Sequence, residues 1–379
     1  MYNDMLYNET HQTKIDTLFT KKSLTKTQIS NSQLNLNEMA QGREILDSLP
    51  RRIIFEITNA CNLNCIMCGR NFSDFCSTQL SFDELCWFKP FFNIIEEVVL
   101  MGWGEPTVHP DFIEILKMLD LFDIRKYFCT NGVKLAEITK ELFDYHVDII
   151  SVSLNGATEY TNDMMRSGKN FKKIINSLKV IVEHKIQINS EFPYLSLVFC
   201  VMRSNLHELP LLVDLAAELG LNRVKVVYLT AFSRDLANEI LWGHEVETQK
   251  IFEIALKKAN SYNIEIMLPY ISGLDPAGQD YHRDCSAPWR DLFIGSDGFI
   301  RPCMSTAEKF FKFDKNKSFH DIWNAPEFIQ YRHSVNSNER MSIFCKNCYQ
   351  SSHCNWNLEK SFMQANKQFS PNWTENKDI

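Results

Sequence analysis

The stretch CNLNCIMC, residues 61–68, decides how this chain of 379 residues is interpreted. It carries three cysteines, Cys61, Cys65 and Cys68, in a C-x3-C-x2-C pattern. Thiolates bind iron–sulfur clusters well, and a four-iron cluster takes four of them when it is fully ligated. Three thiolates in one loop therefore leave one iron open, which is typical of a reactive metal site. A structural zinc site would need a fourth Cys or His at close spacing, and the next cysteine along the chain is Cys76.

The sequence around this loop predicts a parallel sheet. Strand-like apolar runs alternate with helical patterns six times from Arg52 onward. The expected strands are Ile53–Thr58, Glu97–Met101, Lys126–Thr130, Ile149–Leu154, Leu195–Met202 and Arg223–Leu229. Such alternation favours an α/β fold with right-handed crossovers, either an open sheet or a partial barrel. The cysteine loop follows the first strand, so it should lie at the carboxyl-terminal edge of the sheet, where these folds place their active sites.

The cysteine loop resembles the signature of the radical S-adenosylmethionine superfamily, and the likeness extends over roughly residues 52–229. The resemblance implies a partial (β/α)6 barrel. It also implies that Cys61, Cys65 and Cys68 hold a four-iron cluster whose open iron binds S-adenosylmethionine. In that superfamily one electron cleaves S-adenosylmethionine to a 5′-deoxyadenosyl radical, which abstracts a hydrogen atom from the substrate. A reducing partner such as flavodoxin or ferredoxin is implied as well.

Short motifs after the later strands agree with this resemblance. The segment GWGEP, residues 102–106, resembles the family's Gly-Gly-Glu-Pro segment, with Trp103 in place of one glycine. Residues 130–132, Thr-Asn-Gly, resemble another family turn, and strand alternation puts residues 151, 153 and 155 on one face. An arginine in a following loop would suit the carboxylate of the cofactor. The residues expected to bind S-adenosylmethionine are Gly102, Gly104, Glu105, Asn131, Ser151, Ser153, Asn155, Arg166 and Arg203.

A second group of cysteines lies near the carboxyl terminus, at Cys285, Cys303, Cys345, Cys348 and Cys354. Their order resembles the auxiliary-cluster domain of the SPASM and twitch branch of the same superfamily. The resemblance implies a second, auxiliary four-iron cluster held by the first four of these cysteines. Cys354 is then a surplus thiol or an alternative ligand. A structural zinc ion on the same residues stays open, because four thiolates suit both metals. The scattered Cys76, Cys86, Cys129 and Cys200 are interpreted as buried small hydrophobic residues.

These patterns divide the chain into four parts. Residues 1–48 are polar and lack sustained apolar periodicity, so we expect a loosely ordered N-terminal segment. Residues 49–264 are the expected radical S-adenosylmethionine core. Residues 265–360 are the expected small, cysteine-rich SPASM/twitch-like domain, and residues 361–379 are a polar tail.

Composition limits the partners. The net charge of −7 creates no field that would attract nucleic acid or an anionic membrane. No apolar stretch is long enough to cross a bilayer, and the first residues do not resemble a secretory signal. We therefore expect a cytoplasmic protein without a nucleic-acid or membrane partner.

Three functions fit these observations. The first is a radical S-adenosylmethionine enzyme that oxidises or otherwise modifies a small hydroxylated metabolite. A single auxiliary cluster and the lack of an evident peptide-recognition domain favour it. The second is a maturase that cross-links, epimerises or oxidises a ribosomally made peptide or protein. The third, of another class, is a non-catalytic iron–sulfur or zinc electron-transfer module, which would need closed four-cysteine sites only.

Overall fold

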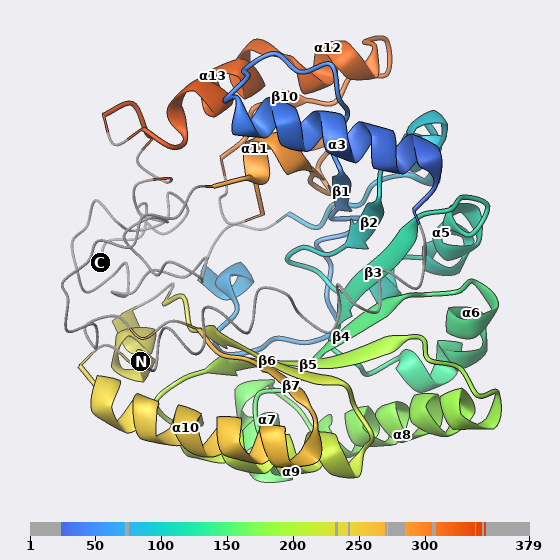
Figure 1. Cartoon of the computed structure of the whole chain (residues 1–379). Helices are drawn as coiled ribbons and strands as arrows, with labels where there is room; N and C mark the ends of the chain where they lie inside the picture. Colours follow the sequence, from blue (N-terminus) through green and yellow to red (C-terminus); the bar gives the residue numbers. More distant parts are fainter. Residues whose placement is uncertain are drawn as a thin grey trace.

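The computed structural model is organised around one sheet with the strand order β10-β9-β8-β1-β2-β3-β4-β5-β6-β7 (Figure 1). The structure describes residues 24–72, 76–231, 234–241, 243–269, 271, 285–304, 308–337, 339–342 and 345. The strands are β1 (Arg52–Phe55), β2 (Glu97–Leu100), β3 (Arg125–Thr130), β4 (Ile149–Ser153), β5 (Tyr194–Val201), β6 (Arg223–Tyr228), β7 (Glu265–Met267), β8 (Asp291–Ile294), β9 (Phe299–Arg301) and β10 (Phe311–Lys312). Strands β1 to β7 pair in parallel, and β8 joins β1 in parallel too. The predicted α/β fold with a parallel sheet is confirmed.

Helices cover the outer side of this sheet (Figure 1). Those of the core are α4 (Phe82–Cys86), α5 (Phe112–Leu119), α6 (Thr139–Asp144), α7 (Glu159–Met165), α8 (Phe171–Gln187), α9 (Leu209–Glu218) and α10 (Glu245–Tyr262). Every second residue of the strands, such as Phe55, Phe128 and Phe199, is buried against them. Burying each such side chain contributes about 2 kcal/mol of hydrophobic free energy. The alternate residues therefore face inward, and several of these are polar, including Tyr127 and Arg223.

Of the segment expected to be loosely ordered, residues 1–23 lie outside the described residues, and residues 24–48 differ from the prediction. Residues Lys26–Ala40 form helix α3, which begins with a capping box between Thr25 and Gln28. The buried face of α3 is polar: Gln28, Asn31, Ser32, Asn35 and Glu38. The Gln28 amide donates to the backbone carbonyls of Ile95 (2.8 Å) and Asp123 (2.5 Å). Hydrophobic periodicity gave only a weak helical pattern, near Leu34 to Leu46, because hydrogen bonds, rather than an apolar stripe, hold this helix to the core.

The boundary expected near residue 265 also differs from the structure. Strand β7 continues the main sheet next to β6, and β8 pairs with β1 at the other end. The C-terminal helices are α11 (Ala287–Arg290), α12 (Phe319–Trp323) and α13 (Pro326–Ser334). The Trp87 ring contacts the rings of Phe313 (4.9 Å between centroids) and Phe319 (6.1 Å). The cysteine-rich part is thus built onto the same sheet. The tail, residues 361–379, lies outside the described residues.

In the part of the chain that the structure describes, no helix is both long and apolar enough to span a bilayer.

The polar attachment of α3 yields a stability prediction. Gln28→Ala removes two hydrogen bonds and leaves two backbone carbonyls without a donor. We expect the free energy of unfolding to fall by about 2–3 kcal/mol, measured by chemical denaturation. The matched control is Gln33→Ala on the exposed face of the same helix, which should change it by less than about 0.5 kcal/mol. Equal effects of the two substitutions would contradict the role given to Gln28.

Candidate active site

The cysteine loop leaves the end of β1 and is fixed by its own backbone. The Cys68 amide donates to the Cys65 carbonyl (3.0 Å), and the Asn71 side-chain amide donates to the same carbonyl (2.7 Å). Before the loop, the Asn59 side chain accepts from the Thr78 amide (2.7 Å) and donates to the Cys76 carbonyl (2.9 Å). Cys61, Cys65 and Cys68 are free thiols and half-buried. The loop is therefore held in shape by hydrogen bonds of its own backbone and of neighbouring asparagines.

The three thiols suit a cluster better than a single ion. Among the described residues, no three His, Cys, Asp or Glu side chains gather closely enough to hold one metal ion. In a four-iron cluster each thiolate binds a different iron, so the sulfur atoms stand farther apart than the ligands of one ion. Burial raises the pKa of the Cys68 thiol to about 11. Its proton must therefore be displaced by the metal when the cluster forms.

Two other segments hold the outer side of the loop. The Ile66 amide donates to the carbonyl of Met165, and the Ser167 hydroxyl donates to the carbonyl of Asn64. In the turn after β3, the side-chain amide of Asn131 donates to the side-chain oxygen of Asn62 (2.6 Å). The same nitrogen lies 3.9 Å from the Cys61 sulfur. An N–H group directed at a cluster sulfur is one of the features that set the potential of such clusters.

The segment GWGEP passes over the chain that leads into the cysteine loop. A Cβ atom on Gly104 would lie 2.2 Å from the Thr58 carbonyl oxygen and 2.6 Å from that of Ala60. The Glu105 amide donates to the same Ala60 carbonyl (2.8 Å). A Cβ atom on Gly102 would meet the Glu56 side chain at 2.3 Å. Both glycines are thus required by close packing against β1 and its loop.

Two buried carboxylates brace these loops. Glu56 accepts from the Trp103 amide (2.7 Å) and from the Ser296 hydroxyl (2.9 Å), which joins the GWGEP segment to the loop after β8. Glu105 accepts from the hydroxyl of Thr130 (2.6 Å) and the amide of Asn131 (2.5 Å). Glu105 was expected from its motif to help bind the cofactor, and the structure gives it a second role, to tie β2 to β3. Glu56 was not predicted, because no motif marks it.

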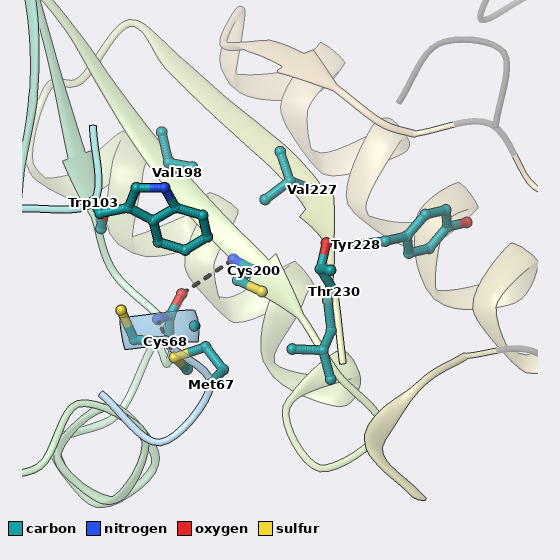
Figure 2. Close-up of a pocket in the computed structure, with 12 residues that line it drawn as sticks. Met67, Cys68, Trp103, Val198, Cys200, Val227, Tyr228 and Thr230 are labelled. Carbon is teal, nitrogen blue, oxygen red and sulfur yellow. Dashed lines mark hydrogen bonds between the residues drawn. The ribbon is translucent and has the colours of Figure 1, made fainter. Parts of the chain in front are cut away.

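A cavity of about 240 Å³ lies beside the cysteine loop (Figure 2). It is lined by Met67, Cys68, Gly69, Trp103, Ser153, Asn155, Val198, Cys200, Val227, Tyr228, Leu229 and Thr230. Figure 2 shows the Trp103 ring on the same side as Val198, while the Tyr228 ring points away from Trp103 and Cys200. The Tyr228 ring stacks 6.5 Å from Phe252 of α10, so Tyr228 borders the cavity mainly through its backbone.

The inner-face residues of β4 and of the turn that follows it lie at two levels. Ser153 and Asn155 line the cavity. The Asn155 side chain accepts from the Cys200 amide (3.1 Å), the dashed line in Figure 2, and its amide lies 3.8 Å from the Met67 sulfur. Ser151 is fully buried one layer below and accepts from the Tyr127 hydroxyl (3.1 Å). The structure therefore brings Ser153 and Asn155 to the cavity wall and places Ser151 beneath it.

The two expected arginines have different environments. Arg166 ends α7, is only 2% exposed, and lies between Met165 and Ser167, which both bond to the cysteine loop. Its Nε and Nη1 atoms have no hydrogen-bond partner among the described residues. Arg203 is exposed in the turn after β5. Arg166 is therefore a buried cation next to the loop with two nitrogen atoms that no described residue pairs with, whereas Arg203 is exposed and does not line the cavity described above.

The comparisons with known proteins agree with this geometry. Family models match at residues 55–195 (Radical SAM superfamily) and 285–349 (Iron-sulfur cluster-binding domain, SPASM). An AdoMet-dependent heme synthase from Methanosarcina barkeri is 30% identical, over 76% of this chain and 86% of that protein. The chain belongs to the radical SAM superfamily. A PqqA peptide cyclase from Bradyrhizobium diazoefficiens is 26% identical over 79% of each chain. The fold is similar to that of Streptococcus suis SuiB bound to S-adenosylmethionine, with a TM-score of 0.61, 17% identity and coverage of 80% and 72% of the two chains.

Membership in the radical SAM superfamily confirms the four-iron cluster, S-adenosylmethionine and an auxiliary cluster as cofactors of this chain. Of the auxiliary cysteines, Cys285 and Cys303 are half-buried and Cys345 is buried. The Cys285 amide donates to the Asn336 side chain (2.9 Å), which fixes the start of the second cysteine group. Cys348 and Cys354 lie outside the described residues. The role of each of these five cysteines as a cluster ligand stays a prediction, as does that of Cys61, Cys65 and Cys68.

The four scattered cysteines differ from the expectation of simple burial. Cys76 is exposed, and Cys86, Cys129 and Cys200 are half-buried. Cys200 lines the cavity, because it alternates with Phe199 on β5 and so faces inward. Burial raises the pKa of this thiol to about 12, so Cys200 stays protonated at neutral pH. The alternation along β5 was the signal that would have found Cys200 and Val198.

The packing of Gly104 yields a prediction for this radical SAM protein. Gly104→Ala places a methyl group against the Thr58 and Ala60 carbonyls, so the cysteine loop must move. We expect the substitution to remove most of the iron bound at Cys61, Cys65 and Cys68, measured as iron and sulfide per chain after anaerobic reconstitution. The control is Gly42→Ala, at the end of α3, where a Cβ atom meets nothing within 4 Å but the backbone (φ +64°) disfavours alanine. Full iron content in Gly104→Ala, or an equal loss in Gly42→Ala, would contradict the role given to Gly104.

Proposed function

We propose that this protein oxidises its substrate by hydrogen abstraction in the cavity beside the cysteine loop. The observation that carries the proposal is that one cavity is lined both by the loop, through Met67 and Cys68, and by the inner faces of β4, β5 and β6. A substrate group in this cavity lies next to the cluster-binding residues. A non-catalytic electron-transfer module has no use for such a cavity, so this arrangement favours an enzyme.

When bound, the four-iron cluster and S-adenosylmethionine would supply the radical chemistry of hydrogen abstraction. The protein's own side chains hold the reactants and keep water out. Trp103, Val198 and Val227 form apolar walls of the cavity. Asn155 ties the cysteine loop to β5 through Met67 and the Cys200 amide. Dry, fixed walls protect a reactive intermediate from side reactions.

We propose that Arg166 binds the carboxylate of S-adenosylmethionine. A buried guanidinium with two unpaired nitrogen atoms carries a desolvation cost that an anion would offset. A carboxylate accepts from an arginine in a two-pronged arrangement. The neighbouring backbone already holds the cysteine loop through Met165, so a cofactor bound by the loop would lie close by.

We propose a peptide or protein side chain as the group that reacts. Among the relatives, the PqqA peptide cyclase is named for a peptide on which it acts, and the similar fold of SuiB has been solved with a precursor peptide bound. The cavity, of about 240 Å³, is smaller than usual ligand sites, which fits one side chain entering from a longer substrate. A small metabolite is the second candidate, because the heme synthase relative is named for a small-molecule product. For either kind of substrate, the auxiliary cluster would accept the electron that the oxidation releases. A flavodoxin or ferredoxin would supply the electron that starts the cleavage of S-adenosylmethionine.

The radical chemistry has a direct test. Anaerobically reconstituted, reduced protein should convert S-adenosylmethionine to 5′-deoxyadenosine, measured by liquid chromatography. Cys65→Ala should abolish this product, because the cluster loses one of three ligands. The matched control is Cys76→Ala at an exposed cysteine that follows the loop, and this variant should keep the activity.

The absence of 5′-deoxyadenosine from protein with a full iron content would sink the proposed function. The same assay separates the two substrate classes. A peptide or protein substrate in a cell extract should accelerate product formation from the fraction retained on dialysis, and a small metabolite should do so from the dialysable fraction.

The assignment of Arg166 predicts a loss of cofactor affinity. Arg166→Met removes charge-assisted hydrogen bonds of about 1.5–3 kcal/mol, so the Kd for S-adenosylmethionine should rise about 10- to 100-fold, measured by equilibrium dialysis. Iron content should stay unchanged. Arg203→Met is the control, because Arg203 is exposed, and it should bind the cofactor normally. If the two variants bind equally well, Arg166 has another task.

A further inference from the structure

The inner face of β6 carries a lysine directly below the cavity. Lys225 precedes the cavity residue Val227 by two positions and pairs in register with the cavity residue Val198 of β5. Residues two apart on a strand share a face and lie about 7 Å apart. The side chain of lysine spans most of that distance. Lys225 is not itself among the lining residues, and an extended side chain at this position is long enough to bring its ammonium group to the floor of the cavity.

The other cations of the inner face have carboxylate partners. The Arg52 guanidinium lies 2.8 Å from an Asp291 oxygen and 3.7 Å from a Glu97 oxygen. The guanidinium of Arg223 lies 3.9 Å from a Glu265 oxygen. These pairs form the layers of the sheet nearest the start of the strands. The cations there are neutralised within the protein.

Lys225 lacks such a partner. Across the described residues, no ion pair or hydrogen bond of its ammonium group is found, and no carboxylate lies within 4 Å of it. Among the groups that act on its pKa, only the Cys129 thiol of β3 favours the charged form, and that sulfur already lies 3.2 Å from the Tyr127 hydroxyl. Burial is the main cause that lowers the pKa of Lys225, and repulsion from Arg223 and Arg52 adds to it. An incoming anion would offset this cost.

We propose that Lys225 binds a carboxylate of the substrate at the floor of the cavity. The inference rests on the proposed function, which puts the substrate's reacting group in this cavity. A carboxylate bound to Lys225 fixes the substrate from below, while the cysteine loop and its cofactors stand at the side. Substrates with a neutral group in place of the carboxylate would leave the ammonium group unpaired, so the lysine also selects among substrates. Arg166, next to the cysteine loop, serves the carboxylate of S-adenosylmethionine instead.

The test uses propionate as the carboxylate probe and propionamide as its neutral counterpart, with the reconstituted holoprotein. A ligand that binds only the folded state raises the Tm, and at about ten times its Kd the rise should be about 2 °C. We expect this rise with propionate in the wild type and in Lys225→Arg, which keeps the cation, and no rise in Lys225→Met. Propionamide should leave all three unchanged. An equal rise in Lys225→Met, or no rise in the wild type, overturns the proposal.

Two further arms remove the remaining ambiguity. Saturating S-adenosylmethionine should leave the propionate effect intact, and its disappearance would mean that Lys225 serves the cofactor. If Lys225→Met does not fold, trace acetylation of the wild type decides: propionate should slow the labelling of Lys225 and not that of exposed Lys140, and propionamide should slow neither. Binding is measured here without turnover. Formation of 5′-deoxyadenosine by the same samples reports separately on the proposed function.

Discussion

The passage of Gly104 over the carbonyls of Thr58 and Ala60 is the contact on which the rest of the site depends. It lets the segment after β2 lie against the segment after β1 without an intervening side chain. The following Glu105 then reaches Thr130 and Asn131 after β3. Three loops from three neighbouring strands are thereby fixed to one another. These contacts fix the positions of the three cysteines in space, which their spacing in the sequence does not do.

The two faces of the sheet divide the work between stability and chemistry. Outward residues such as Phe128 and Phe199 are buried against helices and supply hydrophobic free energy. Inward residues carry polar groups that a fully apolar core would not tolerate without partners. Toward the start of the strands the inward charges pair with one another, as in Arg52 with Asp291. Toward the end, Lys225 and Arg166 have no carboxylate partner among the described residues, and cations without a partner are where anionic ligands gain most from binding.

Helix α3 shows where interpretation of hydrophobic pattern reaches its limit. Its buried side chains are Gln28, Asn31, Ser32, Asn35 and Glu38, while Ile29, Leu34 and Leu36 are each about two-fifths exposed. Hydrophobic periodicity assigns the apolar residues of a helix to its buried face, which is the opposite of what α3 shows. The helix is held through backbone carbonyls of distant segments, such as those of Ile95 and Trp289. Those partners are known only once the chain is folded.

The sequence by itself determined the cluster loop, the parallel sheet and the superfamily, because ligand spacing and strand–helix alternation are local properties of the chain. Only the tertiary structure decided that Glu105 braces two strands, that Arg166 is buried while Arg203 is exposed, and that Cys200 lines a cavity. It also decided that Lys225 stands below that cavity without a carboxylate partner among the described residues. The physical reason is that each of these facts depends on which strands are neighbours and in what register. The cavity brings together residues that are more than a hundred positions apart in the sequence, such as Met67 and Leu229, and a local sequence pattern does not contain this information.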